Sequence, residues 1–211
     1  TKVFISLYGD LKVKEELQQK NHEMEMALVK SQLDPHFLFN TLNNIDILIL
    51  KSPEEASNYL NKLSDIMRFM LFETKTDRVA LDKEIAYIEK YVALQKIRTS
   101  NPNYVSMDVM GSPLGKTIAP MVFLPFIENA FKHSTNKKLD HAIGLKLQIE
   151  DRNIRFECLN KFDSGRKATA PSHGLGNSLI EKRLQLLYPE QHRLTTEKTK
   201  DMYLVTLDIA L

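Results

Sequence analysis

The segment Ser31-Gln-Leu-Asp-Pro-His-Phe-Leu-Phe-Asn-Thr-Leu-Asn-Asn-Ile45 places a proline and a histidine within a pattern that otherwise predicts one long helix, from about residue 9 to residue 50. With about 3.6 residues per turn, four polar residues share one side of that helix: Gln32, His36, Asn40 and Asn43. Apolar residues recur at three- and four-residue steps on the opposite side, as in the seam of a helical bundle or coiled coil. We therefore expect His36 to face away from this seam, where a second domain can reach it.

A second helix is predicted from Ser52-Pro53-Glu54-Glu55 to about Thr74. Serine suits the N-cap, proline suits the first helical position, and Glu55 completes the pattern of a capping box. The apolar seam of this helix repeats in heptads, at Ala56, Leu60, Leu63, Met67 and Met70. Because few residues separate the two helices, we expect an antiparallel hairpin, and two hairpins in a dimer would bury both seams in a four-helix bundle.

The polar segment Lys75-Thr-Asp-Arg78 marks the predicted boundary between two domains, residues 1–77 and residues 78–211. Helices are predicted after it at about 82–98, 120–133 and 175–187, and strands at about 104–109, 143–149, 154–159, 194–197 and 202–211. The polar residues 160–174 predict a loop. The expected fold is α+β: a helical hairpin followed by an α/β sandwich, with helices on one face of a mixed sheet.

Composition limits the class of protein. The charge is nearly balanced, with 29 Lys and Arg against 27 Asp and Glu, which argues against a nucleic-acid partner. A single cysteine, Cys158, excludes an intramolecular disulfide and fits a reducing compartment. The sequence shows no signal peptide and no run of about 20 apolar residues. The apolar residues Val3 to Tyr8 fit either the end of a membrane helix or the start of a short helix.

His36 has two interpretations. A histidine on an amphipathic helix is most often a solvated surface residue. Three features favour a functional histidine instead: Pro35 precedes it, hydrogen-bonding side chains share its side of the helix, and Phe37 and Phe39 flank that polar stripe. A neutral imidazole, with an unperturbed pKa of about 6.5, is a competent nucleophile near neutral pH.

A second cluster closes the apolar segment Pro120-Met-Val-Phe-Leu-Pro-Phe-Ile-Glu-Asn-Ala-Phe-Lys-His133, where Glu128, Asn129, Lys132 and His133 gather. Asn129 and Lys132 are three residues apart and so share a helix face. A neutral oxygen ligand beside an ammonium group is a contact set for magnesium and phosphate. The alternative is an ordinary polar helix end, where the helix dipole favours Lys and His.

A third segment, His173-Gly-Leu-Gly-Asn177, precedes a predicted helix. Its glycines, Gly174 and Gly176, let backbone N–H groups approach a phosphate at the helix N-terminus. Such a pair of glycines is more often a plain turn. The sequence holds no P-loop and no full G-x-G-x-x-G motif, and no Cys/His spacing typical of zinc.

Taken together and in this order, these segments closely resemble the LytS/YehU-type sensor histidine kinases, from about residue 10 to the end of the chain. The segments that carry the resemblance are the phosphoacceptor box at Gln32 to Ile45, the second-helix signature at Leu63 to Phe69, the next helix at Leu81 to Arg98, the N box at Pro120 to His133, and the C-terminal segment at Leu184 to Pro189.

The resemblance implies a homodimeric kinase whose ATP-binding domain shares the fold of DNA gyrase. His36 would attack the γ-phosphate of ATP, and the phosphoryl group would pass to an aspartate in the receiver domain of a response regulator, often one with a LytTR DNA-binding domain. The chain would be the cytoplasmic portion of a bacterial inner-membrane protein, attached through a segment N-terminal to residue 1.

The resemblance also assigns the ATP site. Asn129 would hold Mg²⁺, and the remaining nucleotide contacts would come from Lys132, His133, Asn160, Gly174 and Gly176. Loop 160–174 would close over the nucleotide as a lid. Glu128 is a candidate base for His36, since Pro125 occupies the position, four before Asn129, where gyrase-like ATPases carry glutamate.

Asn160 departs from the pattern of the fold. Many ATPases of this fold carry Asp-x-Gly-x-Gly after a strand, and the aspartate accepts a hydrogen bond from the adenine amine. The amide oxygen of Asn160 can accept that bond without the charge. After Gly176, Asn177 and Leu179 also occupy places where the family usually has Leu and Asn. These departures leave two rival hypotheses open: a dimeric signalling scaffold with a degenerate ATP site, or a kinase of this fold that acts on a protein serine.

Overall fold

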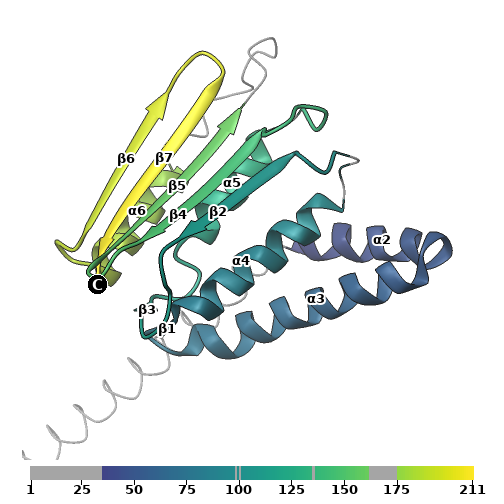
Figure 1. Cartoon of the computed structure of the whole chain (residues 1–211), viewed down its shortest axis with the longest axis horizontal. Helices are drawn as coiled ribbons and strands as arrows, with labels where there is room; N and C mark the ends of the chain where they lie inside the picture. Colours follow the sequence, from purple (N-terminus) through teal and green to yellow (C-terminus); the bar gives the residue numbers. More distant parts are fainter. Residues whose placement is uncertain (1–34, 98, 100, 135, 162–174) are drawn as a thin grey trace, which may run out of the picture.

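The computed structural model describes residues 35–97, 99, 101–134, 136–161 and 175–211. Helices α2 (Pro35–Lys51) and α3 (Pro53–Phe72) form the predicted antiparallel hairpin (Figure 1). Ser52 alone connects them: its N–H donates to Leu48 O at 2.7 Å and its carbonyl accepts from Ala56 N–H at 3.0 Å. Ser52 is the N-cap of α3, but its side chain makes no capping hydrogen bond. The predicted capping box is therefore wrong, because the Ser52 N–H already donates to the last turn of α2.

A five-stranded mixed sheet follows the hairpin. Its strand order is β2-β4-β5-β7-β6. The strands are β2 (Val105–Met110), β4 (Ile143–Ile149), β5 (Asn153–Lys161), β6 (His192–Lys198) and β7 (Met202–Ala210). The β2–β4 pair is parallel and the other pairs are antiparallel. The strict alternation of buried and half-buried residues along β4 is the two-residue period from which the strand was predicted.

Helices cover one face of this sheet (Figure 1). They are α4 (Leu81–Lys96), α5 (Leu124–His133) and α6 (Leu175–Leu187). The covered face of β5 presents Ile154, Phe156, Cys158 and Asn160, all of them buried. Phe156 packs against α5 and the turn before it, with ring centroids 4.6 Å from Phe123 and 6.3 Å from Phe126. The predicted α+β fold, a helical hairpin followed by an α/β sandwich, is confirmed.

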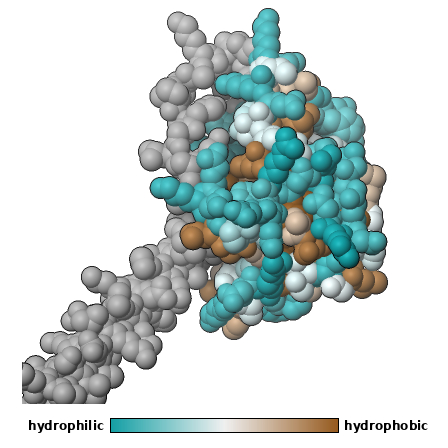
Figure 2. Space-filling view, turned by 90° about the vertical axis from the view of Figure 1, so that its left-hand side faces the viewer, coloured by the Kyte–Doolittle hydropathy of each residue, from teal (hydrophilic) through white to brown (hydrophobic). Residues whose placement is uncertain are grey.

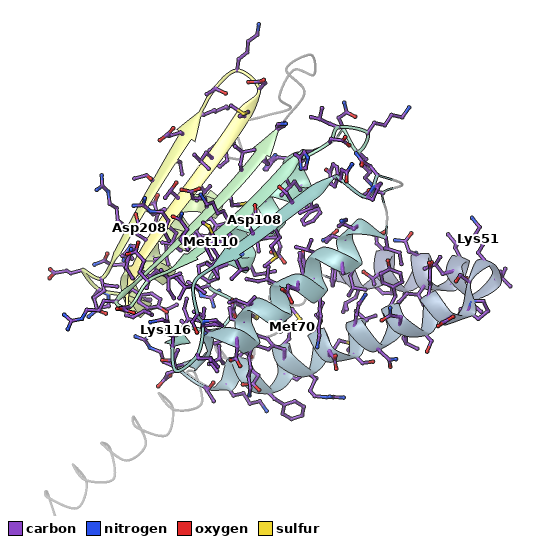
Figure 3. The ribbon with its side chains drawn as sticks, viewed as in Figure 1. Lys51, Met70, Asp108, Met110, Lys116 and Asp208 are labelled. Carbon is purple, nitrogen blue, oxygen red and sulfur yellow. The ribbon has the colours of Figure 1, made fainter. Side chains whose placement is uncertain are left out.

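The opposite face of the sheet is polar. Asp108 of β2 and Asp208 of β7 both lie on the sheet (Figure 3), and Asp208 pairs with Arg155 of β5 at 2.7 Å. Figure 2 shows hydrophilic residues over most of one side of the described structure, with apolar residues scattered among them. Because a polar face can remain in contact with water, helices need to cover only the other face of this sheet.

The helical hairpin packs against α4 through aromatic side chains. Phe69 of α3 stacks on Tyr87 at a centroid distance of 4.5 Å, and Phe37 of α2 stacks on Tyr91 at 4.9 Å. Met70 of α3 is buried beside them (Figure 3). The apolar core therefore runs from the hairpin into the α/β layer. The predicted division into residues 1–77 and 78–211 falls in the turn after η1 (Glu73–Lys75) and remains a prediction.

Two elements differ from the sequence-based expectation. A two-stranded antiparallel sheet, β1 (Val79–Ala80) with β3 (Thr117–Ile118), was not predicted, because a two-residue strand leaves no periodic pattern. Helix α5 begins at Leu124, four residues later than predicted. Met121 has φ of 56°, a left-handed conformation that a helix cannot contain. Of the helices that the structure describes, none has the length and apolar character required to cross a bilayer.

Candidate active site

Helix α5 carries most of the polar residues that the sequence singles out. Glu128 and Asn129 are half-buried, whereas Lys132 and His133 are exposed in its last turn. The helix is fixed on the sheet by its other side: Leu124, Phe126, Ile127 and Ala130 are buried. Because the apolar side is held, the polar residues of α5 are presented at one edge of the helix layer. The binding roles predicted for Asn129, Lys132 and His133 remain predictions.

Asn160 lies near the end of β5, on the face that α5 covers. It is 3% exposed, and two residues before it the buried Cys158 thiol lies 3.6 Å from Phe126 O of α5. Among the described residues, the Asn160 side-chain Nδ2 has no hydrogen-bond partner. A buried amide nitrogen without a partner costs about 1–3 kcal/mol, and a ligand that bonds to it would recover that cost. This side chain therefore fits a polar ligand held between β5 and α5.

Cys158 has no chemical role at this site. Burial raises the pKa of its thiol to about 12, so the sulfur stays protonated and unreactive at neutral pH. Its thiol contacts Phe126 O, which joins β5 to α5. Cys158 is a packing residue that keeps Asn160 in register with the helix above it.

An aromatic chain joins the histidine helix to α5. His36 is the second residue of α2, and its side chain lies outside what the structure describes. The next residue, Phe37, is buried and stacks on Tyr91 of α4. Tyr91 in turn meets the Phe131 ring edge-on, with centroids 6.3 Å apart. Phe131 lies on α5, so this chain of aromatic contacts connects α2 to α5 across α4.

The two glycines predicted to contact phosphate lie in the sequence at the start of α6. Gly174 falls outside the described residues, and Gly176 belongs to the first turn of α6. Helix α6 begins at Leu175, and the N-terminal backbone N–H groups of a helix point outward along its axis; the predicted anion-binding turn remains a prediction.

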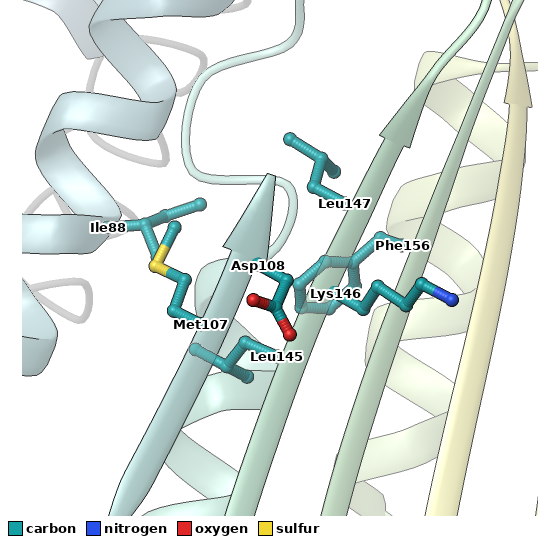
Figure 4. Close-up of a pocket in the computed structure, with 7 residues that line it drawn as sticks. All are labelled: Ile88, Met107, Asp108, Leu145, Lys146, Leu147 and Phe156. Atoms are coloured by element: carbon teal, nitrogen blue, oxygen red, sulfur yellow. The ribbon is translucent and has the colours of Figure 1, made fainter. Parts of the chain in front are cut away.

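Among the described residues, neither the pocket of Figure 4 nor a cluster of metal-ligating side chains includes the predicted site residues. The small pocket between α4 and the sheet is lined by Ile88, Met107, Asp108, Leu145, Lys146, Leu147 and Phe156 (Figure 4), and it includes none of the predicted site residues. Within the described ranges, no group of three or more His, Cys, Asp and Glu residues could hold a metal ion. A magnesium ion at Asn129 would therefore need ligand phosphates to complete its coordination.

Comparison with known proteins identifies the family of the chain. A model of the histidine kinase family matches residues 24–102, the span that contains α2, α3 and α4. An uncharacterized sensor-like histidine kinase of Staphylococcus epidermidis is 34% identical over 142 residues, which are 67% of this chain and 27% of that protein. The chain belongs to the histidine kinase family. The resemblance to the LytS/YehU-type sensor histidine kinases is thereby confirmed.

Two further matches are to proteins named as kinases. Sensor protein kinase HptS of Staphylococcus aureus is 33% identical over 141 residues, 66% of this chain and 27% of HptS. The chain thus spans about a quarter of the length of these curated relatives. The solved structure of histidine kinase AdeS of Acinetobacter baumannii matches 86% of this chain and 96% of its own, at 13% identity and a TM-score of 0.42.

One buried residue of this kinase was missed as a site residue. Glu84 of α4 is 0% exposed, and its Oε2 accepts a hydrogen bond from Met121 N–H at 2.9 Å. Burial raises the pKa of its carboxyl group to about 7. The sequence placed Glu84 only within a family motif, because a glutamate on an amphipathic helix is ordinarily assigned to the solvent side. Its contacts come from residues 37 and 99 positions away, which no local pattern reveals.

Proposed function

We propose that the chain is the catalytic part of an ATP-dependent protein-histidine kinase, which phosphorylates its own His36 and passes the phosphoryl group to a response-regulator aspartate. One observation carries the proposal: the stack of Phe37 on Tyr91, and of Tyr91 on Phe131, holds the histidine helix beside the helix of Asn129. Phosphoryl transfer depends mainly on positioning and charge neutralisation, and such packing supplies positioning.

The nucleotide is proposed to lie between α5, β5 and the start of α6. Asn129 holds Mg²⁺ together with the phosphates, Lys132 and His133 neutralise phosphate charge, and Gly174 and Gly176 contribute backbone N–H groups. The adenine base lies at Asn160. The side-chain amide of Asn160 offers both a hydrogen-bond acceptor and a donor, whereas an aspartate carboxylate would only accept. Its Oδ1 accepts from the adenine amine and its Nδ2, unpartnered among the described residues, donates to the ring nitrogen beside that amine.

The chemistry proceeds in two transfers. A ring nitrogen of neutral His36 attacks the γ-phosphorus, the bond from that phosphorus to the β–γ bridging oxygen breaks, and ADP leaves with the bond electrons. The imidazole proton passes to a base, for which Glu128 is the candidate on α5. In the second transfer a receiver-domain carboxylate attacks the phosphohistidine, the P–N bond breaks with its electrons on the ring nitrogen, and that nitrogen takes up a proton, which returns His36 to its neutral form.

A homodimer is proposed from the hairpin. Part of each predicted seam packs within the chain, and part is exposed: Leu42 (47%), Ile49 (52%), Leu60 (48%) and Met67 (38%). Residues seven apart lie on one stripe of a helix, so these side chains form two exposed apolar rows. A second hairpin that covers both rows makes the predicted four-helix bundle. Membrane attachment of the N-terminal segment, and a regulator of the LytTR type, belong to the same proposal.

The direct test is incubation with γ-labelled ATP and Mg²⁺. The wild type should gain acid-labile, alkali-stable label, His36→Gln should gain none, and the matched control His141→Gln, which changes an exposed histidine, should label like the wild type. Equal labelling of His36→Gln would reject the assignment. An acid-stable product would instead indicate a serine kinase.

A second candidate is a dimeric scaffold that has lost ATP turnover. Asn160 in place of the usual aspartate favours it, since an uncharged acceptor gives a weaker hydrogen bond. Calorimetric titration with Mg–ATP separates the two functions. Binding in the micromolar range contradicts the scaffold, whereas no detectable heat at millimolar nucleotide contradicts the kinase.

A further inference from the structure

The peptide that joins Pro120 to Met121 is held at both ends by side chains from distant parts of the chain, the buried Glu84 and the partly buried Arg183. Its N–H donates to Glu84 Oε2 at 2.9 Å, and its carbonyl accepts from Arg183 Nη2 at 3.0 Å. One residue earlier, Ala119 N–H donates to Tyr188 Oη at 2.7 Å. We call Glu84, Arg183 and Tyr188 the peptide clamp. A single peptide unit bonded on both sides has little freedom to rotate.

The clamp joins three helices at the base of the candidate site. Glu84 lies on α4, Arg183 lies on α6, and Tyr188 directly follows α6. The clamped peptide lies in the turn that leads into α5, and its Met121 has φ of 56°. A methionine in this left-handed conformation is strained, and strain of this kind persists only where the surroundings hold it. The side chains of the clamp supply that hold, and they determine where α5 begins.

We propose that Glu84 and Arg183 are positioning residues for Mg–ATP, which fix α5 with Asn129 relative to α6 and so set nucleotide affinity. The inference rests on the proposed function, because it concerns the nucleotide that α5 and α6 would share. Asn129 lies eight residues after Met121, on the helix that begins three residues after it, so a small rotation at the clamped peptide displaces Asn129. Displacements of about 1 Å in such sites cost large factors in activity.

The charges around Glu84 indicate how the clamp responds to pH. The titratable groups that face it are Arg183 and Tyr188 from the α6 side and Tyr87 from α4 itself. Arg183 is the only cation among them. An ionised Glu84 accepts a stronger hydrogen bond from Met121 N–H and attracts Arg183, so deprotonation tightens the clamp. Burial raises the pKa of Glu84 to about 7, which places this change in the neutral range.

The experiment measures Kd for Mg–ATP by calorimetry from pH 6 to pH 8.5 for the wild type, Glu84→Gln and Glu84→Ala. Glu89→Gln is the matched control, because Glu89 is exposed on the same helix. Loss of the acceptor in Glu84→Ala should weaken binding about ten-fold or more, whereas Glu84→Gln keeps an acceptor and should stay within about three-fold. The ratio of the Glu84→Gln Kd to the wild-type Kd should rise with pH, and this ratio cancels the titration of ATP itself.

Each outcome decides a separate point. If the wild type binds no Mg–ATP, the proposed function fails and the inference fails with it. If the wild type binds and the folded Glu84→Ala protein binds equally well, the inference alone is overturned. Should Glu84→Ala not fold, the pH ratio for Glu84→Gln and the Kd of Arg183→Met decide instead. The positioning role is refuted if the ratio of the Glu84→Gln Kd to the wild-type Kd does not depend on pH and Arg183→Met leaves Kd unchanged.

Discussion

Replacing Glu84 by glutamine should change how the stability of the protein depends on pH. In the unfolded chain a glutamate ionises near its ordinary pKa of 4.5, whereas burial in the folded protein raises the pKa of Glu84 to about 7. Between these values the folded protein keeps a proton that the unfolded chain has lost. The stabilisation that Glu84 adds to the free energy of unfolding is therefore complete below about pH 4.5 and is lost as the pH rises through about 7.

The size of the effect follows from the two pKa values. They differ by about 2.5, and each pKa unit corresponds to about 1.4 kcal/mol, so the free energy of unfolding should fall by roughly 3 kcal/mol between pH 4.5 and pH 7.5 through this residue. Glu84 is fully buried, so solvent does not screen this cost. Glutamine carries no ionisable group and removes the dependence.

Urea unfolding followed by circular dichroism, at half-unit steps from pH 5 to pH 8, measures the effect. The unfolding free energy of the wild type minus that of Glu84→Gln should decrease by about 2–3 kcal/mol across this range. The unfolding free energy of the wild type minus that of the exposed-site control Glu89→Gln should not change with pH. A wild-type minus Glu84→Gln difference that varies by less than about 0.5 kcal/mol would refute the raised pKa and its assigned cause.

Three further predictions concern the site and the dimer. Tyr91→Leu removes a stacking contact with Phe37 worth about 0.5–1.5 kcal/mol. Label incorporation should show autophosphorylation several-fold slower, and calorimetry should show an unchanged Kd for Mg–ATP. An unchanged rate would contradict the positioning role of the stack. Leu60→Glu with Met67→Glu should convert a dimer to a monomer in sedimentation experiments, because two charges would be buried at the apolar rows; a persisting dimer would place the interface elsewhere. Asn160→Ala should weaken ATP binding about ten-fold in the same calorimetric assay, while equal binding would remove Asn160 from the base pocket.

Periodic patterns predicted most of the fold. The alternation in β4 and β5 and the apolar face of α3 are local properties, and each element lies within a few residues of its expected bounds. Helix α5 shows where such patterns stop. Its apolar run begins at Pro120, yet the helix begins at Leu124, because Glu84 and Arg183 fix the intervening peptide from positions far away in the sequence.

The candidate site divides in the same way. Asn129 was predicted from the polar cluster that closes an apolar segment, whereas Asn160 was predicted only from the family resemblance. Glu84 was not predicted as a site residue because its burial is a tertiary property: α4 is covered by the hairpin on one side and by the turn before α5 on the other. The role of Phe37 was likewise invisible, since nothing in the sequence pairs it with Tyr91.

The measurement that tests the central proposal most directly is mapping of the phosphorylated residue. The protein is incubated with Mg–ATP, digested at neutral pH to preserve phosphohistidine, and sequenced by mass spectrometry. We predict a phosphoryl group on His36, lost on addition of ADP because the transfer is reversible. A phosphoryl group on any other residue, or none after hours with millimolar Mg–ATP, would contradict the proposed kinase.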